Sequence, residues 1–359
     1  MAPSALAPAF FAGDEARRAR GVVLDRMGFG PRPQPSRTVW RWRRRHLLAY
    51  QPPNRRQGAV LIVPAPIKAP YIWDLAPGAS VVERLLSAGL QVYKVVWQRP
   101  EAEDESMGLA QYADTALGEC LDTMRAETGQ TNAFLAGHSL GGTLAAIFAS
   151  LHPDRVAGLV ELEAPIEFGS GRMEAAVASS PHLSVIGASF GNVPGTFLNL
   201  ASAYADPISF GAQPWLDWLA SSASAKTNRL HWQVRRWTLD EAPMARRLFE
   251  EVGEMLYREN RFAERRLRLA GRLADPRAID VPILAVLDPR SRIVPPSSIE
   301  AYRSRTGSAD VQILEYFGDA GVVLQHVGVL VGRNAHETIW PRIAEWLRNA
   351  QRSTVNRAR

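Results

Sequence analysis

A serine flanked by glycines near the middle of the chain constrains the fold more than any other feature. The pentapeptide Gly137-His138-Ser139-Leu140-Gly141 follows an apolar run, 133–136, and precedes a run of small and helix-forming residues, 142–151. This order predicts a strand that turns sharply at Ser139 and continues as a helix. A turn of this kind needs small neighbours, and glycine lies two positions before and two after the serine. We therefore predict that Ser139 is held at the tip of the turn.

A second stretch, 187–191, has the same spacing of glycine, serine and glycine, with Ser189 at its centre. The Asn-Val-Pro-Gly sequence that follows it cannot continue as a helix, whereas residues 143–151 can. The flanks therefore favour Ser139 over Ser189. A strand, turn and helix around a serine are typical of the nucleophile elbow of α/β-hydrolases.

The remaining segments alternate between extended and helical patterns, as a parallel sheet requires. Strands are predicted at 59–64, 91–97, 156–162, 281–287 and 311–317, and helices at 80–88, 108–127 and 337–349. The interval between Phe168 and about Ala278 breaks this alternation and is too long for a loop in a compact core. We predict an α/β-hydrolase fold, with a mostly parallel central sheet flanked by helices and a cap domain inserted over the active site.

This prediction divides the chain into five parts. They are an N-terminal extension (1–38), the first part of the core (39–168), the cap or lid (169–277), the second part of the core (278–350) and a C-terminal tail (351–359).

A serine nucleophile needs a histidine base that a carboxylate orients, and in this fold the chain order is serine, acid, histidine. Five of the seven histidines do not fit: His138 lies inside the elbow and is expected to point elsewhere, and His46, His152, His182 and His231 come too early. His326 lies between the last predicted strand and the C-terminal helix, whereas His336 lies at the start of that helix. We predict His326 as the base.

Several stretches resemble the polyhydroxyalkanoate synthases, in particular their short subunits of about this length. They lie between residues 39 and 347 and comprise 63–75, 92–97, 159–168, 236–260, the Ile-Val-Pro-Pro motif at 293–296, and 326–328. The resemblance implies acyl transfer from hydroxyacyl-coenzyme A or a hydroxyalkanoate ester or polyester, with neither a cofactor nor a metal. It also implies a polyester granule surface, a partner subunit or a second copy of the chain as further partners.

Two departures from this family concern catalysis. Members that polymerise have cysteine at the centre of the elbow, where this chain has Ser139. The family aspartate lies four residues before the first proline of the Ile-Val-Pro-Pro motif, and that position is Ser291 here. Asp288, at the end of the same predicted strand, is our first choice for the acid. Glu163, after the preceding core strand, is the alternative.

Glu167 follows the same core strand as Glu163 and offers the same route to His326. The competing interpretation of a carboxylate here is an ion pair with arginines of the cap.

The resemblance to α/β-hydrolases also predicts where the oxyanion and the substrate bind. Two backbone N–H groups must face the developing oxyanion, and we assign them to Leu140, directly after the nucleophile, and Ile67, in the loop after an early strand. Aromatic residues of the cap are candidates for an acyl tunnel, although packing within the cap is the competing explanation. These residues are Trp215, Trp218, Trp232, Trp237 and Tyr257, of which we assign Trp237 and Tyr257 to substrate binding.

The function expected from these residues is formation of an acyl-serine, with hydrolysis or acyl exchange favoured over polymer synthesis. An acyl-serine is itself an oxygen ester, so transfer of the chain to another hydroxyl gains little free energy. True polyhydroxyalkanoate synthesis is the first alternative. A catalytically weakened subunit that binds granules or regulates a partner is the second, because the family aspartate is missing.

Composition bounds the compartment and the partners. The chain has 359 residues, 46% hydrophobic and 22% charged, with a single cysteine. It lacks a basic start before its short N-terminal apolar patch and any apolar stretch near the roughly 20 residues of a membrane span. We therefore expect a cytoplasmic protein without a transmembrane segment, located at granules if the resemblance extends so far.

The positive charge gathers in one run, Trp-Arg-Trp-Arg-Arg-Arg-His at 40–46, which we predict as the first strand of the sheet. Cations on a solvated edge strand oppose pairing with other chains. An anionic partner is the alternative, and because no nucleic-acid-binding motif accompanies the run, nucleic acid is not expected as a partner.

Overall fold

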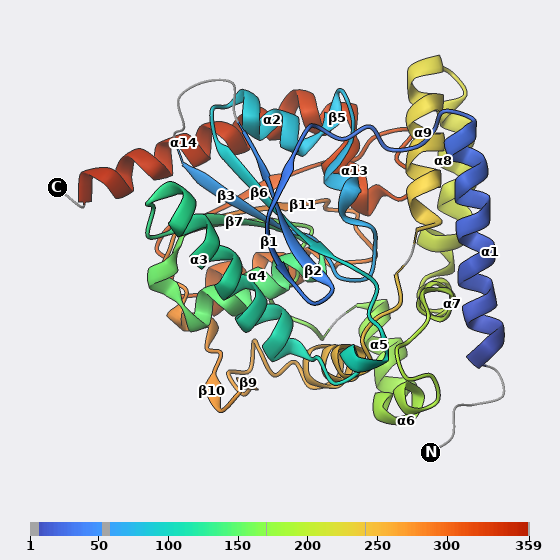
Figure 1. Ribbon diagram of the computed structural model, residues 1–359, viewed down its shortest axis with the longest axis horizontal. Coiled ribbons are helices and arrows are strands. Elements are labelled where there is room, and N and C mark those ends of the chain that lie inside the picture. Colours follow the sequence, from blue (N-terminus) through green and yellow to red (C-terminus); the bar gives the residue numbers. More distant parts are fainter. Residues whose placement is uncertain (1–6, 52–57, 170, 241, 358–359) are drawn as a thin grey trace.

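The computed structural model describes residues 7–51, 58–169, 171–240 and 242–357. Its centre is an eight-stranded sheet in the order β1-β2-β6-β3-β7-β8-β11-β12 (Figure 1). The strands are β1 (Arg37–Trp42), β2 (Arg45–Tyr50), β3 (Ala59–Val63), β6 (Gln91–Trp97), β7 (Ala133–His138), β8 (Val156–Leu162), β11 (Ile283–Leu287) and β12 (Val311–Glu315). Of the eight strands in this sheet, β2 alone runs opposite to the other seven. The predicted mostly parallel sheet is confirmed.

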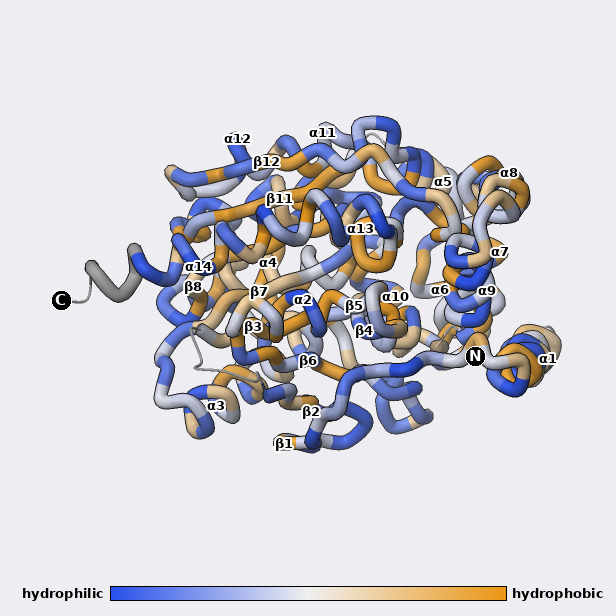
Figure 2. The backbone as a smooth tube through the Cα atoms, turned by 90° about the horizontal axis from the view of Figure 1, so that it is seen from above, coloured by the Kyte–Doolittle hydropathy of each residue, from blue (hydrophilic) through white to orange (hydrophobic). Residues whose placement is uncertain are grey.

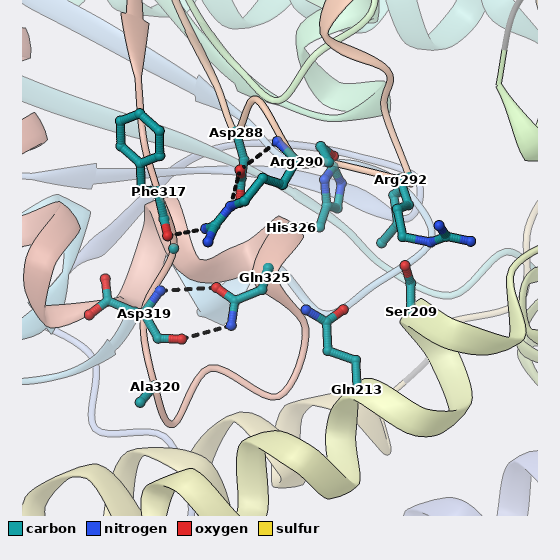
Figure 3. Close-up of a pocket in the computed structure, with 13 residues that line it drawn as sticks. Ser209, Gln213, Asp288, Arg290, Arg292, Phe317, Asp319, Ala320, Gln325 and His326 are labelled. Carbon is teal, nitrogen blue, oxygen red and sulfur yellow. Dashed lines mark hydrogen bonds and ion pairs between the residues drawn. The ribbon is translucent and has the colours of Figure 1, made fainter.

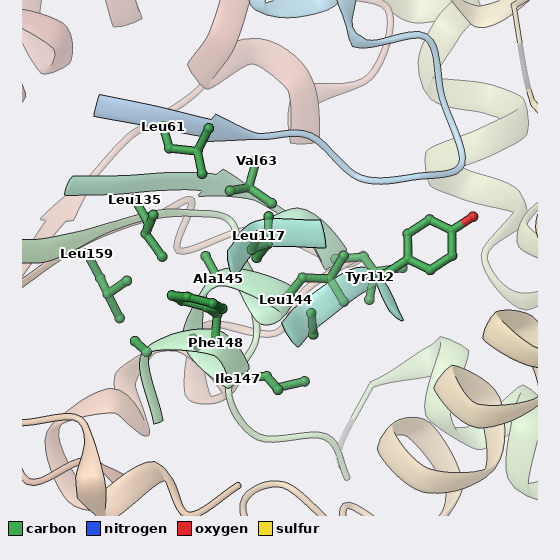
Figure 4. Packing of buried hydrophobic residues seen from close by; sticks show 14 of the residues in the cluster. Leu61, Val63, Tyr112, Leu117, Leu135, Leu144, Ala145, Ile147, Phe148 and Leu159 are labelled. Carbon is green, nitrogen blue, oxygen red and sulfur yellow. The ribbon is translucent and has the colours of Figure 1, made fainter. Parts of the chain in front are cut away.

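Helices cover both faces of the sheet (Figure 1). One face carries α3 (Ala116–Thr128) and α4 (Leu140–Leu151), and the other carries α2 (Val81–Ser87), α13 (Gly328–Val331) and α14 (Trp340–Arg357). Beneath the elbow, Leu144 and Phe148 of α4 pack near Leu61 and Leu135 of the sheet (Figure 4). β3 and β11 contain only apolar residues, and β11 appears in the colours of hydrophobic residues in Figure 2, because helices bury both faces of the central sheet.

Between β8 and β11 the chain leaves the sheet and forms a layer of helices beside its edge (Figure 1). These are α5 (Arg172–Ser179), α6 (Leu183–Ala188), α7 (Gly195–Ala205), α8 (Gln213–Ser221), α9 (Ala225–Thr238) and α10 (Arg246–Glu251), followed by a hairpin of β9 (Arg268–Leu269) and β10 (Arg272–Leu273). Two short helices, α11 (Pro296–Glu300) and α12 (Tyr302–Arg305), and the small hairpin β4 (Asp74–Ala76) and β5 (Ala79–Ser80) complete these elements.

The N-terminal helix α1 (Ala7–Arg26) belongs to this helical layer. The sequence patterns did not predict that the N-terminal segment joins it. Asp14 accepts hydrogen bonds from the backbone N–H groups of Gly195 and Thr196 at the start of α7. The Arg236 guanidinium of α9 donates to the Asp25 carboxylate at 2.7 and 2.8 Å. Polar contacts with residues about 200 positions later hold α1, and local patterning carries little of that information.

Two other elements differ from the sequence prediction. Residues 40–46 form not one strand but the end of β1, a turn at Arg43 and Arg44, and the start of β2, and Arg43 has a φ of 47° in this turn. The C-terminal α-helix begins at Trp340 rather than residue 337, because residues 335–339 form a wider helical turn. Among the described residues, no helix is long and apolar enough to cross a membrane.

Candidate active site

Ser139 lies at the sharp turn between β7 and α4. Its backbone has φ 54° and ψ −133°, a region that side chains rarely adopt and that costs about 1–3 kcal/mol. A side chain at Gly137 would collide with Gly142, and one at Gly141 would collide with the Val63 carbonyl. The two glycines therefore allow the helix to pass close to the sheet while Ser139 is held at the turn.

Three cavities are lined by Ser139, by His326 or by both residues. The apolar cavity, of about 450 Å³, is lined by Ser139, Leu140 and Ile67 together with apolar side chains of α5, α6, α7 and α10. The inner cavity, of about 160 Å³, is lined by both Ser139 and His326. The polar cavity, of about 620 Å³, is lined by His326 as well (Figure 3). The nucleophile and the base predicted from the sequence thus share one cavity.

His326 lies in a short helical turn that leads into α13. Its carbonyl oxygen accepts a hydrogen bond of 2.8 Å from the Nε2–H of His138, and the two rings lie 4.5 Å apart. Burial lowers the pKa of His326 to about 4, so its imidazole is neutral near pH 7 and ready to accept a proton. His138 therefore supports the base, a contact that the sequence analysis missed by expecting this side chain to point elsewhere.

Glu163 is the carboxylate that the structure places beside His326. Its Oε2 lies 3.6 Å from His326 Nδ1, and its side chain is 1% exposed. Glu163 has a φ of 45° directly after β8, which turns it out of the strand direction. Its Oε1 accepts a hydrogen bond from the backbone N–H of Asp288, and the Ser291 hydroxyl favours its ionised form.

Asp288, our first choice from the sequence, is engaged elsewhere. Its Oδ1 accepts hydrogen bonds from the Arg290 backbone N–H at 2.8 Å and from the Arg290 Nε at 3.1 Å (Figure 3). The carboxylate therefore closes its own turn and pairs with an arginine. The geometry reverses the order of preference, and Glu163 becomes the candidate for the acid.

Other sequence candidates lie outside this arrangement. Glu167 forms a two-bond pair with Arg305. His336 donates from Nε2 to the Leu330 carbonyl, a structural contact near the start of α14. Ser189 caps the end of α6 with a φ of −73°, so it lacks the strained backbone of an elbow.

The aromatic candidates separate into two groups. Trp237 lines the inner cavity, and Tyr257 lines both the inner and the apolar cavities. Trp237 is fixed by a hydrogen bond from its Nε1 to the Ala69 carbonyl. By contrast, Trp215 and Trp218 are exposed on α8, and Trp232 packs against Phe29.

A pH dependence follows from the burial of Glu163. Burial raises the pKa of this carboxyl to about 8, the nearby Asp288 charge acting in the same direction. Only the ionised carboxylate stabilises a protonated His326, so we expect kcat/KM to rise with pH and to level off above about 8. Rates for a chromogenic short-chain ester across this range check the prediction, and Glu163→Gln should remove the rise. A profile in Glu163→Gln that parallels the wild type would contradict it.

The raised pKa of Glu163 also predicts how the stability of the protein depends on pH. A carboxyl whose pKa is raised in the folded state contributes stability that is present below its unfolded value and is lost as pH rises through about 8. Glu163→Gln should therefore raise the Tm at alkaline pH, while the difference from wild type shrinks towards pH 4.

The sheet order, with a serine at the turn between β7 and α4, defines the class of α/β-hydrolases. A model of the alpha/beta hydrolase fold family matches residues 4–321. The chain belongs to this family.

Curated relatives are poly(3-hydroxyalkanoate) polymerase subunits PhaC. That of Haloferax mediterranei is 28% identical over 324 residues, 89% of this chain and 64% of that protein, so the match spans less than two thirds of the relative. That of Allochromatium vinosum is 26% identical over 82% of both chains, and that of Synechocystis is 29% identical over 81% of this chain and 78% of the relative. The resemblance to polyhydroxyalkanoate synthases that the sequence motifs indicated is confirmed.

Solved structures with the same fold include lipases. A monoacylglycerol lipase from Paleococcus ferrophilus has a TM-score of 0.52 and 18% identity, covering 85% of this chain and 99% of that one. A soluble variant of monoglyceride lipase from Saccharomyces cerevisiae has a TM-score of 0.55 and 13% identity, covering 89% and 96%. At these identities the likeness concerns the fold alone.

Proposed function

We propose that the protein is an acyl-transfer enzyme that forms an ester between Ser139 and a hydroxyacyl group. The donor is a hydroxyacyl thioester of coenzyme A or a hydroxyalkanoate ester. The observation that carries this proposal is the shared inner cavity, where a strained serine and a neutral histidine face the same space and a buried carboxylate lies behind the histidine.

Each of these groups has a role in the proposed mechanism. His326 Nδ1 faces Glu163, which leaves Nε2 to accept the proton as Ser139 Oγ attacks the acyl carbon. The ionised Glu163 stabilises the imidazolium that forms. His326 then returns the proton to the leaving thiol or alcohol, and the acyl group remains on Ser139. Water or another alcohol removes it by the same steps in reverse order.

The oxyanion is assigned to two backbone N–H groups. Leu140 is the first residue of α4, so its N–H has no acceptor within the helix. Ile67 lines the same apolar and inner cavities as Ser139, from the loop after β3. Both residues thus adjoin the nucleophile, as stabilisation of a tetrahedral intermediate requires.

The cavities support an apolar acyl group and a polar leaving group. Leu183, Phe197 and Phe249 are among the side chains that line the apolar cavity, which suits the alkyl part of a hydroxyacyl chain. The polar cavity, which His326 also lines, is lined by Arg290 and Arg292. A leaving group with polar or charged parts fits this cavity, because both arginines can pair with anionic groups.

Hydrolysis or acyl exchange is the outcome that a serine favours. A cysteine thioester lies above an oxygen ester in free energy, so attack by a hydroxyl is downhill, whereas an acyl-serine gains little from the same transfer. Attack by water still releases the acyl group irreversibly. Polymer synthesis is the second candidate, and the similarity to polymerase subunits supports it.

Product analysis with 3-hydroxybutyryl-coenzyme A separates these outcomes. We expect thiol release with free hydroxy acid or short exchange products as the main species. Ser139→Cys is the matched variant, because it changes the ester to a thioester in the same site, and it should shift the products towards polymer. High-molecular-weight polyester as the main wild-type product would overturn the preference for hydrolysis. Absence of both thiol release and ester cleavage would overturn the proposed function itself.

A further inference from the structure

The loop that leads to His326 is tied to the helical insertion by one carboxylate. Asp217 of α8 accepts hydrogen bonds from three consecutive backbone N–H groups of this loop. They come from Gly321 at 2.8 Å and Val322 at 3.3 Å to Oδ1, and from Val323 at 2.9 Å to Oδ2. In Figure 3 the loop that carries Ala320 dips towards the helix that carries Gln213 of α8.

This tie lies in a region from which water is excluded. The Asp217 side chain is 2% exposed, and Val322 and Val323 are fully buried. Without the carboxylate, these buried N–H groups would lose their acceptor, which is unfavourable where water cannot replace it. Three consecutive backbone N–H groups of the loop therefore depend on Asp217 for their acceptor.

The backbone of the loop is itself strained. Val323 has a φ of 62°, which is unfavourable for a β-branched side chain. Gly321 also has a positive φ, and a side chain there would meet the Thr227 carbonyl of α9 at 2.6 Å. A conformation of this kind persists only where its surroundings hold it in place.

His231 of α9 completes the arrangement. Its Nδ1 lies 2.7 Å from Asp217 Oδ2, and its side chain is 5% exposed. This contact fixes the direction of the carboxylate and links α8, α9 and the loop. On the other side, the Asp319 carboxylate accepts hydrogen bonds from the backbone N–H groups of Asn334 and Ala335, so it ties the start of the loop to the segment before α14 rather than to the helical insertion.

We propose that Asp217, oriented by His231, is a positioning residue that sets the place of His326 relative to Ser139. Only Leu324 and Gln325 separate the strained Val323 from His326, so a shift of the loop moves the base directly. The inference rests on the proposed acyl-transfer function of Ser139 and His326. It adds a residue outside the cavities that Ser139 and His326 line, contributed by the helical insertion rather than by the sheet.

The first test uses Asp217→Asn, which keeps the shape of the side chain and one acceptor. Its amide NH₂ faces N–H donors on one side, so the loop loses part of its anchor. We expect kcat for a short ester and the rate of Ser139 modification by a fluorophosphonate to fall by about 10- to 100-fold, because misplacement by about 1 Å has effects of this size. KM and the far-ultraviolet circular dichroism should stay close to wild type.

The matched control is Ser221→Ala on the same helix. Ser221 is equally buried, but its hydroxyl donates to the Trp218 carbonyl rather than to the loop. Its kcat should stay within about twofold of wild type, since the substitution removes no hydrogen bond to the loop. If Asp217→Asn does not fold, His231→Phe replaces it and should lower kcat several-fold in the same direction. An unchanged kcat in the folded variants would overturn the proposal.

A double-mutant cycle with His326→Ala separates positioning from a general structural effect. If Asp217 acts through the base, Asp217→Asn should have no further effect on the residual modification rate of His326→Ala. Multiplied losses would show that Asp217 acts on the whole site, and the proposal would fail.

Hydrogen exchange measured by mass spectrometry tests the tie without any activity. Peptides that cover residues 318–327 should exchange faster in Asp217→Asn than in wild type or Ser221→Ala. If exchange is faster in Asp217→Asn but the wild-type protein shows no reaction at Ser139, the tie is supported and the proposed function is rejected. Unchanged exchange would reject the tie.

Discussion

Replacing Ser139 by alanine is expected to lower turnover of ester or thioester substrates by at least about 10⁴-fold, because the bond-forming oxygen is removed. A fluorophosphonate probe should modify wild-type protein at Ser139, and the modification should be absent in Ser139→Ala. Intact-mass measurement followed by peptide mapping identifies the modified residue. The fold should be retained, since the replaced side chain only lines cavities.

Ser189→Ala is the control for this experiment. Ser189 lies in the second glycine-serine-glycine stretch, and its hydroxyl bonds to the Val185 carbonyl within α6. Its loss should leave turnover and modification unchanged. Modification at a residue other than Ser139, or full activity in Ser139→Ala, would show that the elbow serine is not the nucleophile.

Glu163→Gln is expected to lower kcat by about 10³- to 10⁴-fold, because serine proteases lose a similar factor when the carboxylate that orients their histidine becomes an amide. Asp288→Asn should lower kcat by less than about tenfold, since the Asp288 carboxylate stabilises the turn at Arg290. Steady-state rates of the two variants at pH 9, where Glu163 is ionised, give the comparison. The opposite order would return the role of acid to Asp288.

A substitution at Ser291 tests directly whether a carboxylate at this position can serve as the acid. Because the Ser291 side chain adjoins the Glu163 carboxylate, an aspartate at this position would place a charge near the same space. In the Glu163→Gln background, Ser291→Asp should recover at least about tenfold of the lost rate, as expected for a carboxylate that again faces His326. Lack of recovery, with both proteins folded, would indicate that only the Glu163 backbone position brings a carboxylate to the histidine.

Local sequence patterns determined the parts of this protein that depend on near neighbours. The strand, turn and helix around Ser139 require glycines and apolar runs within about ten residues, and the structure has β7 and α4 at those places. β3 and β11 were found for the same reason, because a strand buried on both faces is mostly apolar. His326 was selected by its place after the last strand.

Only the tertiary structure distinguished the two carboxylates. β8 pairs with β11 so that Leu162 lies opposite Val286, and Glu163 and Asp288 therefore end side by side at one edge of the sheet. Their separation in sequence hides this proximity, and the positive φ of Glu163 directs one of them to the base. The hydrogen bond from His138 to the His326 carbonyl and the tie from Asp217 to the loop also join distant segments. Sequence patterns report local conformation and burial, whereas these contacts arise from how strand ends and the helical layer meet in space.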